Sequence, residues 1–339
     1  MAPGSRRALL LGAFGALAVF VVLFVVVGAE YVIDALLAAD PAFVAATIIL
    51  GLAWLASWSL MLRSVLETLG VGVTVGKAFL VYAGAVFANN VTPFGQAGGE
   101  PFSALLISRS TGAKYETGLA GIATVDVSNV APSVLLALVG VGYYATTATV
   151  GERLENALTG ALVLVTVLGL VLALGWAVRD RIEAYVPATI AKVAGRFGGG
   201  RLNPVALERE IAGRVAHFFA DLRRVGTSRR QLAFIVGLSL LGWLFQAAAL
   251  LAAFAAVGHS VHVSVVLFAI PLANLAGAAP LPGGLGGIEA AFVLLLVPTT
   301  AVPVPEITAA VLIFRGAVYW LPMLIGGSST AAMGIWTVA

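Results

Sequence analysis

Long apolar runs separated by short polar stretches dominate the chain. Three of them, within 9–27, 157–178 and 232–257, contain no charged side chain. A helix of about 20 residues crosses roughly 30 Å of hydrocarbon at a rise of about 1.5 Å per residue. An isolated segment satisfies all of its backbone hydrogen bonds inside lipid only as a helix. The pattern therefore predicts an all-α, polytopic helical membrane protein.

Composition strengthens this prediction and excludes several classes of site. Of the 339 residues, 60% are hydrophobic and 10% are charged, with a mean hydropathy of +1.04, whereas about a quarter of the residues of a soluble domain carry charge. The chain has no cysteine, which rules out disulfides, thiolate metal sites and thiol redox chemistry. We expect no metal, no cofactor and no nucleic-acid partner, despite a pI near 9.4.

The basic residues indicate how the chain is oriented. With the N-terminus inside, further helices are expected over 43–61, 118–144 and 307–336. Of the 19 Lys and Arg residues, 17 then lie inside, eleven of them between Arg179 and Arg230. Cytoplasmic loops carry such an excess of Lys and Arg. We expect a multi-pass protein of the plasma membrane whose N-terminus, basic loop and C-terminus are cytoplasmic.

The basic loop divides the chain into three parts. A first membrane half over 1–178 and a second over 231–339 flank a cytoplasmic linker over 179–230. Within the linker, 204–224 interleaves apolar and basic side chains as an amphipathic helix does. This segment either lies on anionic headgroups or forms a solvated connector between the halves.

Each membrane half contains the same short motif. Residues 93–100 read PFGQAGGE and residues 282–289 read PGGLGGIE, so both fit the pattern PxGxxGxE at an offset of 189 positions. Another charged residue follows 26 positions after the glutamate of each motif, Asp126 in the first half and Arg315 in the second. The similarity therefore extends beyond the glycines and indicates an internal repeat.

The motifs predict two hairpins that enter and leave the membrane on the same side. Pro and Gly interrupt a helix and leave backbone groups that lipid cannot satisfy, so the broken segments must face a cavity enclosed by protein. We expect re-entrant hairpins over 79–109 and 264–297, the first entered from inside and the second from outside. Two such halves are inverted repeats. Helix ends that meet near the midplane attract anions such as phosphate.

Four charged residues are expected at membrane depth, where each costs a few kcal/mol if unpaired. In one interpretation Arg315 anchors a substrate phosphate, while Glu100, Asp126 and Glu289 carry protons or pair in turn with the arginine. In the other, Arg315 pairs with Asp126 and the glutamates cap hairpin helices. The candidate binding and transport residues are Asn89, Asn90, Thr92, Pro93, Gly95, Gln96, Gly98, Gly99, Glu100, Asp126, Asn274, Pro282, Gly283, Gly284, Gly286, Gly287, Glu289 and Arg315.

Other polar and aromatic residues carry weaker signals. The amides and hydroxyl near the first motif either hold headgroup oxygens or cap the backbone. His259 and His262 have the spacing of a weak metal pair, but an outer loop without a third ligand is favoured. We expect Trp54, Trp58, Trp243 and Trp320 to be interfacial or packing residues.

The segments NNVTPFGQAGGEP and PLPGGLGGIEAAF, with the later Arg315, resemble the lysylphosphatidylglycerol synthase transmembrane region family, also called flippase-like domain proteins. The resemblance covers essentially the whole chain. It implies a helical membrane protein that moves an aminoacylated phospholipid, or a polyprenyl-phosphate-linked sugar, between leaflets. No synthase domain is present in the sequence, so lipid aminoacylation is not implied. The family often has an acidic residue followed by Arg after the first hairpin, whereas this chain has Asp126-Val127.

The expected function is that of a flippase acting by alternating access on a phosphate-bearing lipid. Its partners are membrane lipids with anionic headgroups, and its drive is a proton or ion gradient or the gradient of the substrate itself. A secondary transporter for a small soluble anion would use the same features. A membrane-embedded lipid-modifying enzyme is disfavoured because the sequence contains no recognisable catalytic constellation, so we expect no enzymatic activity.

Overall fold

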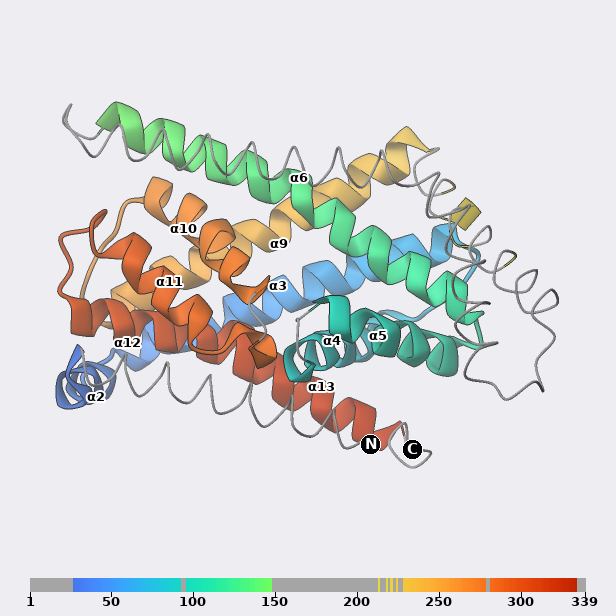
Figure 1. Ribbon diagram of the computed structural model, residues 1–339, viewed down its shortest axis with the longest axis horizontal. Helices are drawn as coiled ribbons and strands as arrows, with labels where there is room; N and C mark the ends of the chain where they lie inside the picture. The colour runs from blue at the N-terminus through green and yellow to red at the C-terminus, as the bar shows by residue number, and fades with distance from the viewer. Residues whose placement is uncertain are drawn as a thin grey trace, which may run out of the picture.

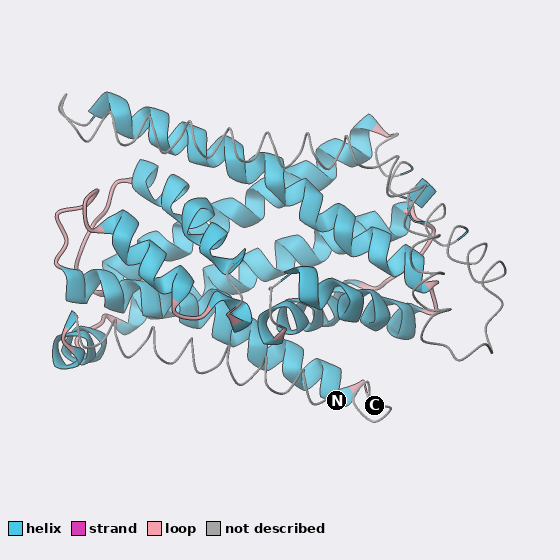
Figure 2. Cartoon of the chain, viewed as in Figure 1, coloured by secondary structure: helices cyan, strands magenta, loops and turns pink. Residues whose placement is uncertain are grey.

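In the computed structural model, regular structure consists only of helices throughout the described part of the chain (Figures 1 and 2). The structure describes residues 27–92, 96–147, 228–278 and 281–333, with isolated positions between 213 and 224. The all-α prediction is confirmed for this part. The predicted helices at 9–27 and 157–178, and the amphipathic helix at 204–224, lie outside the described residues except for Val27 and a few linker positions.

Among the described residues, four helical segments are long and apolar enough to cross a membrane. They are α3 (Pro41–Thr68), α6 (Tyr115–Thr147), α9 (Arg229–Ala256), and α12 (Val304–Arg315), which continues through the π-helix η3 (Gly316–Trp320) into α13 (Leu321–Ala332). Their mean hydropathies lie between 1.7 and 2.0. The helices predicted in these regions are confirmed, and the protein is a polytopic membrane protein.

A short helix precedes the first spanning helix of the described chain. Residues 29–37 form a separate short helix, α2 (Ala29–Leu37), which contains Glu30 and Asp34. Gly28 precedes it with φ of +90°, a backbone conformation that a residue with a side chain rarely adopts. Asp40 then accepts a 2.8 Å hydrogen bond from the backbone N–H of Ala42 and caps α3.

Two helical hairpins lie between the long helices. The first joins α4 (Val75–Val91) to α5 (Gln96–Thr111), and the second joins α10 (Val263–Leu275) to α11 (Gly287–Leu296) through the 3₁₀ turns η1 (Ala276–Ala278) and η2 (Pro282–Gly284). At about 1.5 Å per residue, helices of this length are shorter than the roughly 30 Å hydrocarbon core. The hairpins are close to the predicted 79–109 and 264–297, although the first extends further at both ends.

The hairpins exchange contacts with the long helices. Helix α3 packs along α9, α4 packs along α13, and α10 packs along α6, so in Figure 1 each hairpin lies against a long helix from the other half of the chain. Trp54, Trp58 and Trp243 are buried where α3 meets α9, with edge-to-face ring separations of 5.3 and 5.5 Å. These three are packing residues, whereas Trp320 is half exposed.

We expect Gly326→Ala to lower stability by about 1–3 kcal/mol, the usual cost of overpacking. A Cβ atom on Gly326 would overlap the carbonyl oxygen of Ala83, so α13 would have to move away from α4. Thermal unfolding in detergent measures the loss. Gly237→Ala is the matched control, because that helical glycine has open space around it. Equal unfolding temperatures for the two variants would contradict the close approach of α4 and α13.

Candidate functional site

A buried ion pair joins the second hairpin to the helix that follows it, since Glu289 lies on α11 and Arg315 on α12. The Arg315 Nε atom donates a 2.7 Å hydrogen bond to Glu289 Oε1, and the two residues are 7% and 1% exposed. The other carboxylate oxygen of Glu289 accepts a 2.7 Å hydrogen bond from the backbone N–H of Gly286. Glu289 therefore caps α11 with one carboxylate oxygen and binds Arg315 with the other. This confirms the expected capping role for this glutamate.

Arg315 is also held by the turn of the hairpin and by an aromatic ring. One terminal nitrogen of the guanidinium lies 3.3 Å from the carbonyl oxygen of Gly283. The guanidinium carbon lies 4.4 Å from the centre of the Tyr319 ring, a cation–π arrangement. Tyr319 belongs to the π-helix η3, which begins directly after Arg315. Such π-turns occur frequently at functional sites.

The expected alternative in which Arg315 pairs with Asp126 is wrong for this structure. Both residues have a partner within their own half: Arg315 pairs with Glu289, and Asp126 interacts with Glu100. The physical reason is that α11 runs alongside α12, as α5 runs alongside α6. Two residues separated by 26 positions therefore lie side by side, one on the hairpin helix and one on the helix that follows it.

In the first half, two acidic residues occupy the positions equivalent to those of the ion pair, Glu100 on α5 and Asp126 on α6. The side chains of Glu100 and Asp126 are within hydrogen-bonding reach of each other. The Asp126 Oδ2 atom is buried without a hydrogen-bond partner in the described part. Tyr82 of α4 lies close enough to Asp126 for an electrostatic interaction between the two side chains. A carboxylate only accepts hydrogen bonds, so a bond between these two groups requires a proton on one of them.

The turns of the two hairpins contact each other. Helix α4 meets η2, and the two hairpins approach near the centre of Figure 1. A Cβ atom on Gly283 would lie 3.0 Å from the Asn90 carbonyl oxygen, 2.5 Å from Tyr319 Cε2 and 2.7 Å from the Tyr319 hydroxyl. With φ of +58°, Gly283 also adopts left-handed backbone. The absent side chain thus lets the second turn reach both the first hairpin and Tyr319.

The remaining candidates are polar residues of the described part, residues outside it or with undescribed surroundings, and residues near the second turn. Asn89 packs its side chain against Gly99, and its Oδ1 atom is buried without a hydrogen-bond partner among the described residues. Thr92 donates a 2.8 Å hydrogen bond to the carbonyl oxygen of Ala88, in agreement with a backbone-capping role, and Asn274 is exposed. Pro93 and Gly95 lie outside the described residues, as do the surroundings of Gln96 and Gly98. Near the second turn lie Pro282, Gly284, Gly286 and Gly287.

Two functional candidates escaped the sequence analysis. Tyr319 follows Arg315 by four positions, the spacing at which side chains meet on one face of a helix, so a search around the arginine would have found it. Tyr82 lies 18 positions before Glu100 and is brought near Asp126 only by tertiary folding, in which α4 packs on α5 and α5 packs on α6. The sequence contains no local signal for that contact.

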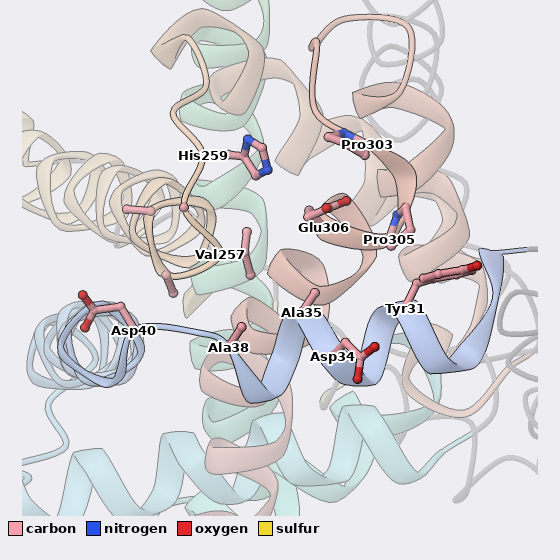
Figure 3. A pocket seen from close by; sticks show the side chains of 13 residues that line it. Tyr31, Asp34, Ala35, Ala38, Asp40, Val257, His259, Pro303, Pro305 and Glu306 are labelled. Carbon is pink, nitrogen blue, oxygen red and sulfur yellow. The ribbon is translucent and has the colours of Figure 1, made fainter.

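A pocket of about 640 Å³ lies away from the hairpin turns, between α2, the end of α9 and the start of α12 (Figure 3). Asp34, Asp40, His259 and Glu306 line it, whereas Arg315 and the turn glycines do not. The described residues contain no group of three potential metal ligands. His262 instead caps α10 through Ser264 and stacks on Tyr143, which agrees with the loop role expected for the two histidines.

In the described part of the chain, four helices of spanning length and two shorter hairpins, with a buried ion pair beside the second hairpin, define a polytopic helical membrane protein. Residues 10–326 match the family described as Lysylphosphatidylglycerol synthase TM region. The chain belongs to this family, which confirms the resemblance drawn from its two Gly-rich segments.

Two relatives extend the similarity along nearly the whole chain. Both are described as UPF0104 membrane proteins of Methanothermobacter thermautotrophicus. One is 25% identical over 319 residues, covering 92% of this chain and 91% of the relative. The other is 27% identical over 321 residues, covering 91% and 90%. The similarity therefore includes both hairpins and the long helices around them.

Proposed function

We propose that the protein is a lipid flippase that moves a phosphate-bearing lipid between leaflets by alternating access. The observation that carries this proposal is the junction of the two hairpin turns. There Gly283 contacts the end of α4, and its carbonyl oxygen lies 3.3 Å from Arg315. A buried cation at the meeting point of two broken helices suits an anionic headgroup, while the acyl or prenyl chains remain in the bilayer.

The proposal includes an inverted repeat, which the positions of the helices support. Helices α3 and α9 begin at residues 41 and 229, α4 and α10 at 75 and 263, α5 and α11 at 96 and 287, and α6 and α12 at 115 and 304. The separations are 188, 188, 191 and 189 residues, against 189 for the glycine motifs. A nearly constant offset through four consecutive elements is expected for two copies of one unit.

The packing supports the same relation. Under a two-fold exchange, α4 corresponds to α10, and α6 corresponds to the segment from α12 to α13. The contact of α4 with α13 then becomes the contact of α10 with α6, and both are present. Trp54 of α3 and Trp243 of α9 also differ by 189 positions. Together with the inner location of 17 basic residues, this favours halves of opposite orientation, with the basic loop in the cytoplasm.

In the proposed mechanism, Arg315 holds the phosphate of the lipid. A guanidinium has five N–H donors, and the described contacts use one for Glu289 and one for Gly283. The remaining donors have no hydrogen-bond partner among the described residues, so they can bind phosphate oxygens without loss of the ion pair. Rocking of one half against the other along α3 and α9 would open the space between the hairpins alternately to each leaflet.

Leaflet exchange in liposomes tests the proposed function. Purified protein is reconstituted with a fluorescent phospholipid or a fluorescent polyprenyl-phosphate analogue, and a membrane-impermeant reductant bleaches the outer leaflet. We expect bleaching of inner-leaflet probe only in the protein-containing vesicles. Protein-free vesicles are the control.

Two further outcomes separate the other functions. Uptake of radiolabelled phosphate without lipid movement would favour the transporter of a small soluble anion. Chemical conversion of the lipid analogue, detected by mass spectrometry of the same vesicles, would overturn the expectation that the protein is not an enzyme. Recovery of the unchanged analogue from both leaflets supports the flippase.

A further inference from the structure

The two halves place different charges at equivalent positions. In the second half, Glu289 meets Arg315 and the pair is neutral without any proton. In the first half, Glu100 meets Asp126, 189 positions earlier in both cases. The arginine position is thus occupied by a second acid, and this pair carries two negative charges unless it binds a cation.

The surroundings supply no compensating charge in the described part of the chain. From α4, the Tyr82 hydroxyl is the titratable group near Asp126. The neighbouring helices α3, α9 and α10 form no ion pair with either carboxyl among the described residues. Asn129, one turn beyond Asp126, already binds α9, since its Oδ1 accepts a 2.6 Å hydrogen bond from Ser239 and its carbonyl oxygen accepts one from Trp243.

The buried carboxylate oxygen of Asp126 indicates that the acidic pair binds a further ligand. Asp126 Oδ2 is buried and has no hydrogen-bond partner among the described residues, although a buried polar atom normally has one. The charges themselves also require a counter-ion, because two adjacent carboxylates at membrane depth are costly. One bound proton removes one of the negative charges and converts an acceptor into the donor that the contact with Glu100 requires.

We propose that Glu100 and Asp126 form a proton-binding site that couples a proton gradient to lipid movement. One proton binds between the two carboxyl groups in one access state and leaves to the opposite side in the other, without any covalent change. The coupling rests on the proposed function, whereas proton binding by the pair does not. The two halves thus have different roles, with an anion site at Glu289 and Arg315 and a proton site at Glu100 and Asp126.

Infrared spectroscopy tests proton binding independently of transport. The C=O stretch of a protonated carboxyl is recorded in H₂O and D₂O while pH is varied. We expect the full-length wild type to show such a band, and Asp126→Asn to lose it. Asparagine has the same shape and can donate to Glu100, so this variant should remain folded, which its thermal unfolding in detergent verifies. Glu67→Gln, at a half-exposed glutamate paired with Arg63, is the control that retains the band.

The infrared outcomes decide whether a proton is bound. A wild type without the band, or an Asp126→Asn variant that retains it, overturns the proton site. A band that vanishes when sodium replaces choline would instead assign the pair to a metal cation and also overturn the proposal. A band that is independent of the salt, and that Glu100→Gln also alters, supports a proton shared by both carboxyls.

Lipid distribution at steady state tests the coupling. With the membrane potential clamped to zero, one proton per lipid predicts about a tenfold ratio of lipid between leaflets for each pH unit across the membrane. We expect this ratio for the wild type and for Glu67→Gln, but a ratio near one for Asp126→Asn. A wild type that equilibrates lipid without responding to pH overturns the coupling alone. A wild type that moves no lipid overturns the proposed function, and the infrared band then still decides proton binding.

Discussion

Arg315→Ala is expected to reduce lipid movement to the level of protein-free vesicles. Arg315 is the only basic side chain that is buried in the described part of the chain, and it lies at the junction of the hairpins. Without it, a phosphate entering between the turns meets Glu289 and no cation. The measurement is the leaflet-exchange assay, normalised to the amount of protein inserted in the vesicles.

The same substitution also removes the partner of Glu289, so stability has to be separated from transport. A buried carboxylate that loses its partner destabilises a protein by about 3–5 kcal/mol. The double variant Arg315→Ala with Glu289→Gln removes both charges. We expect it to recover most of the lost thermal stability and none of the transport.

Glu289→Gln alone provides the opposite control. It keeps the arginine and the shape of the carboxyl, and its amide oxygen can still accept from the backbone N–H of Gly286. We expect this variant to bind phosphate-bearing lipid, with transport reduced far less than in Arg315→Ala. Normal transport by a folded Arg315→Ala protein would remove the anchor role of the arginine. Transport restored in the double variant would show that stability alone was responsible.

The positions of the long helices could be predicted because the membrane imposes a simple rule on the sequence. A span of this length must be apolar, and this signal is carried by composition without any tertiary contact. The hairpins were also predictable, since Pro282 and the turn glycines interrupt apolar runs at a regular offset. What the apolar pattern could not reveal was α2, a short helix that contains Glu30 and Asp34.

The partners within the charged pairs could not be predicted from the sequence alone. Opposite charge favoured a pair between Arg315 and Asp126, but the geometry of adjacent antiparallel helices favours residues of the same half. The equal 26-residue separations already contained this information, because a hairpin arm and the next helix bring two such residues side by side. The proximity of Tyr82 to Asp126 had no comparable signal, since it depends on tertiary folding. The π-helix over Gly316–Trp320 likewise had no signal in the apolar pattern.

Gly283→Ala is expected to impair both stability and transport by separating the hairpin turns. Left-handed backbone costs a residue with a side chain roughly 1–2 kcal/mol. In addition, the new Cβ atom would lie within 2.7 Å of two Tyr319 atoms and 3.0 Å from the Asn90 carbonyl oxygen. Overpacking of this kind adds about 1–3 kcal/mol. Thermal unfolding and leaflet exchange measure the two effects.

Gly258→Ala separates the backbone cost from the contact. Gly258 has φ of +80° but no atom within 4 Å of the position of a Cβ atom, so its substitution incurs only the conformational penalty. We expect Gly258→Ala to lower the unfolding temperature slightly and to retain transport, whereas Gly283→Ala loses more of both. Because Tyr319 can move and the backbone of α4 cannot, the remaining strain falls on the contact between the turns. Equal effects of the two substitutions would mean that this contact is dispensable, and the site would then have to be sought around Arg315 within the second half alone.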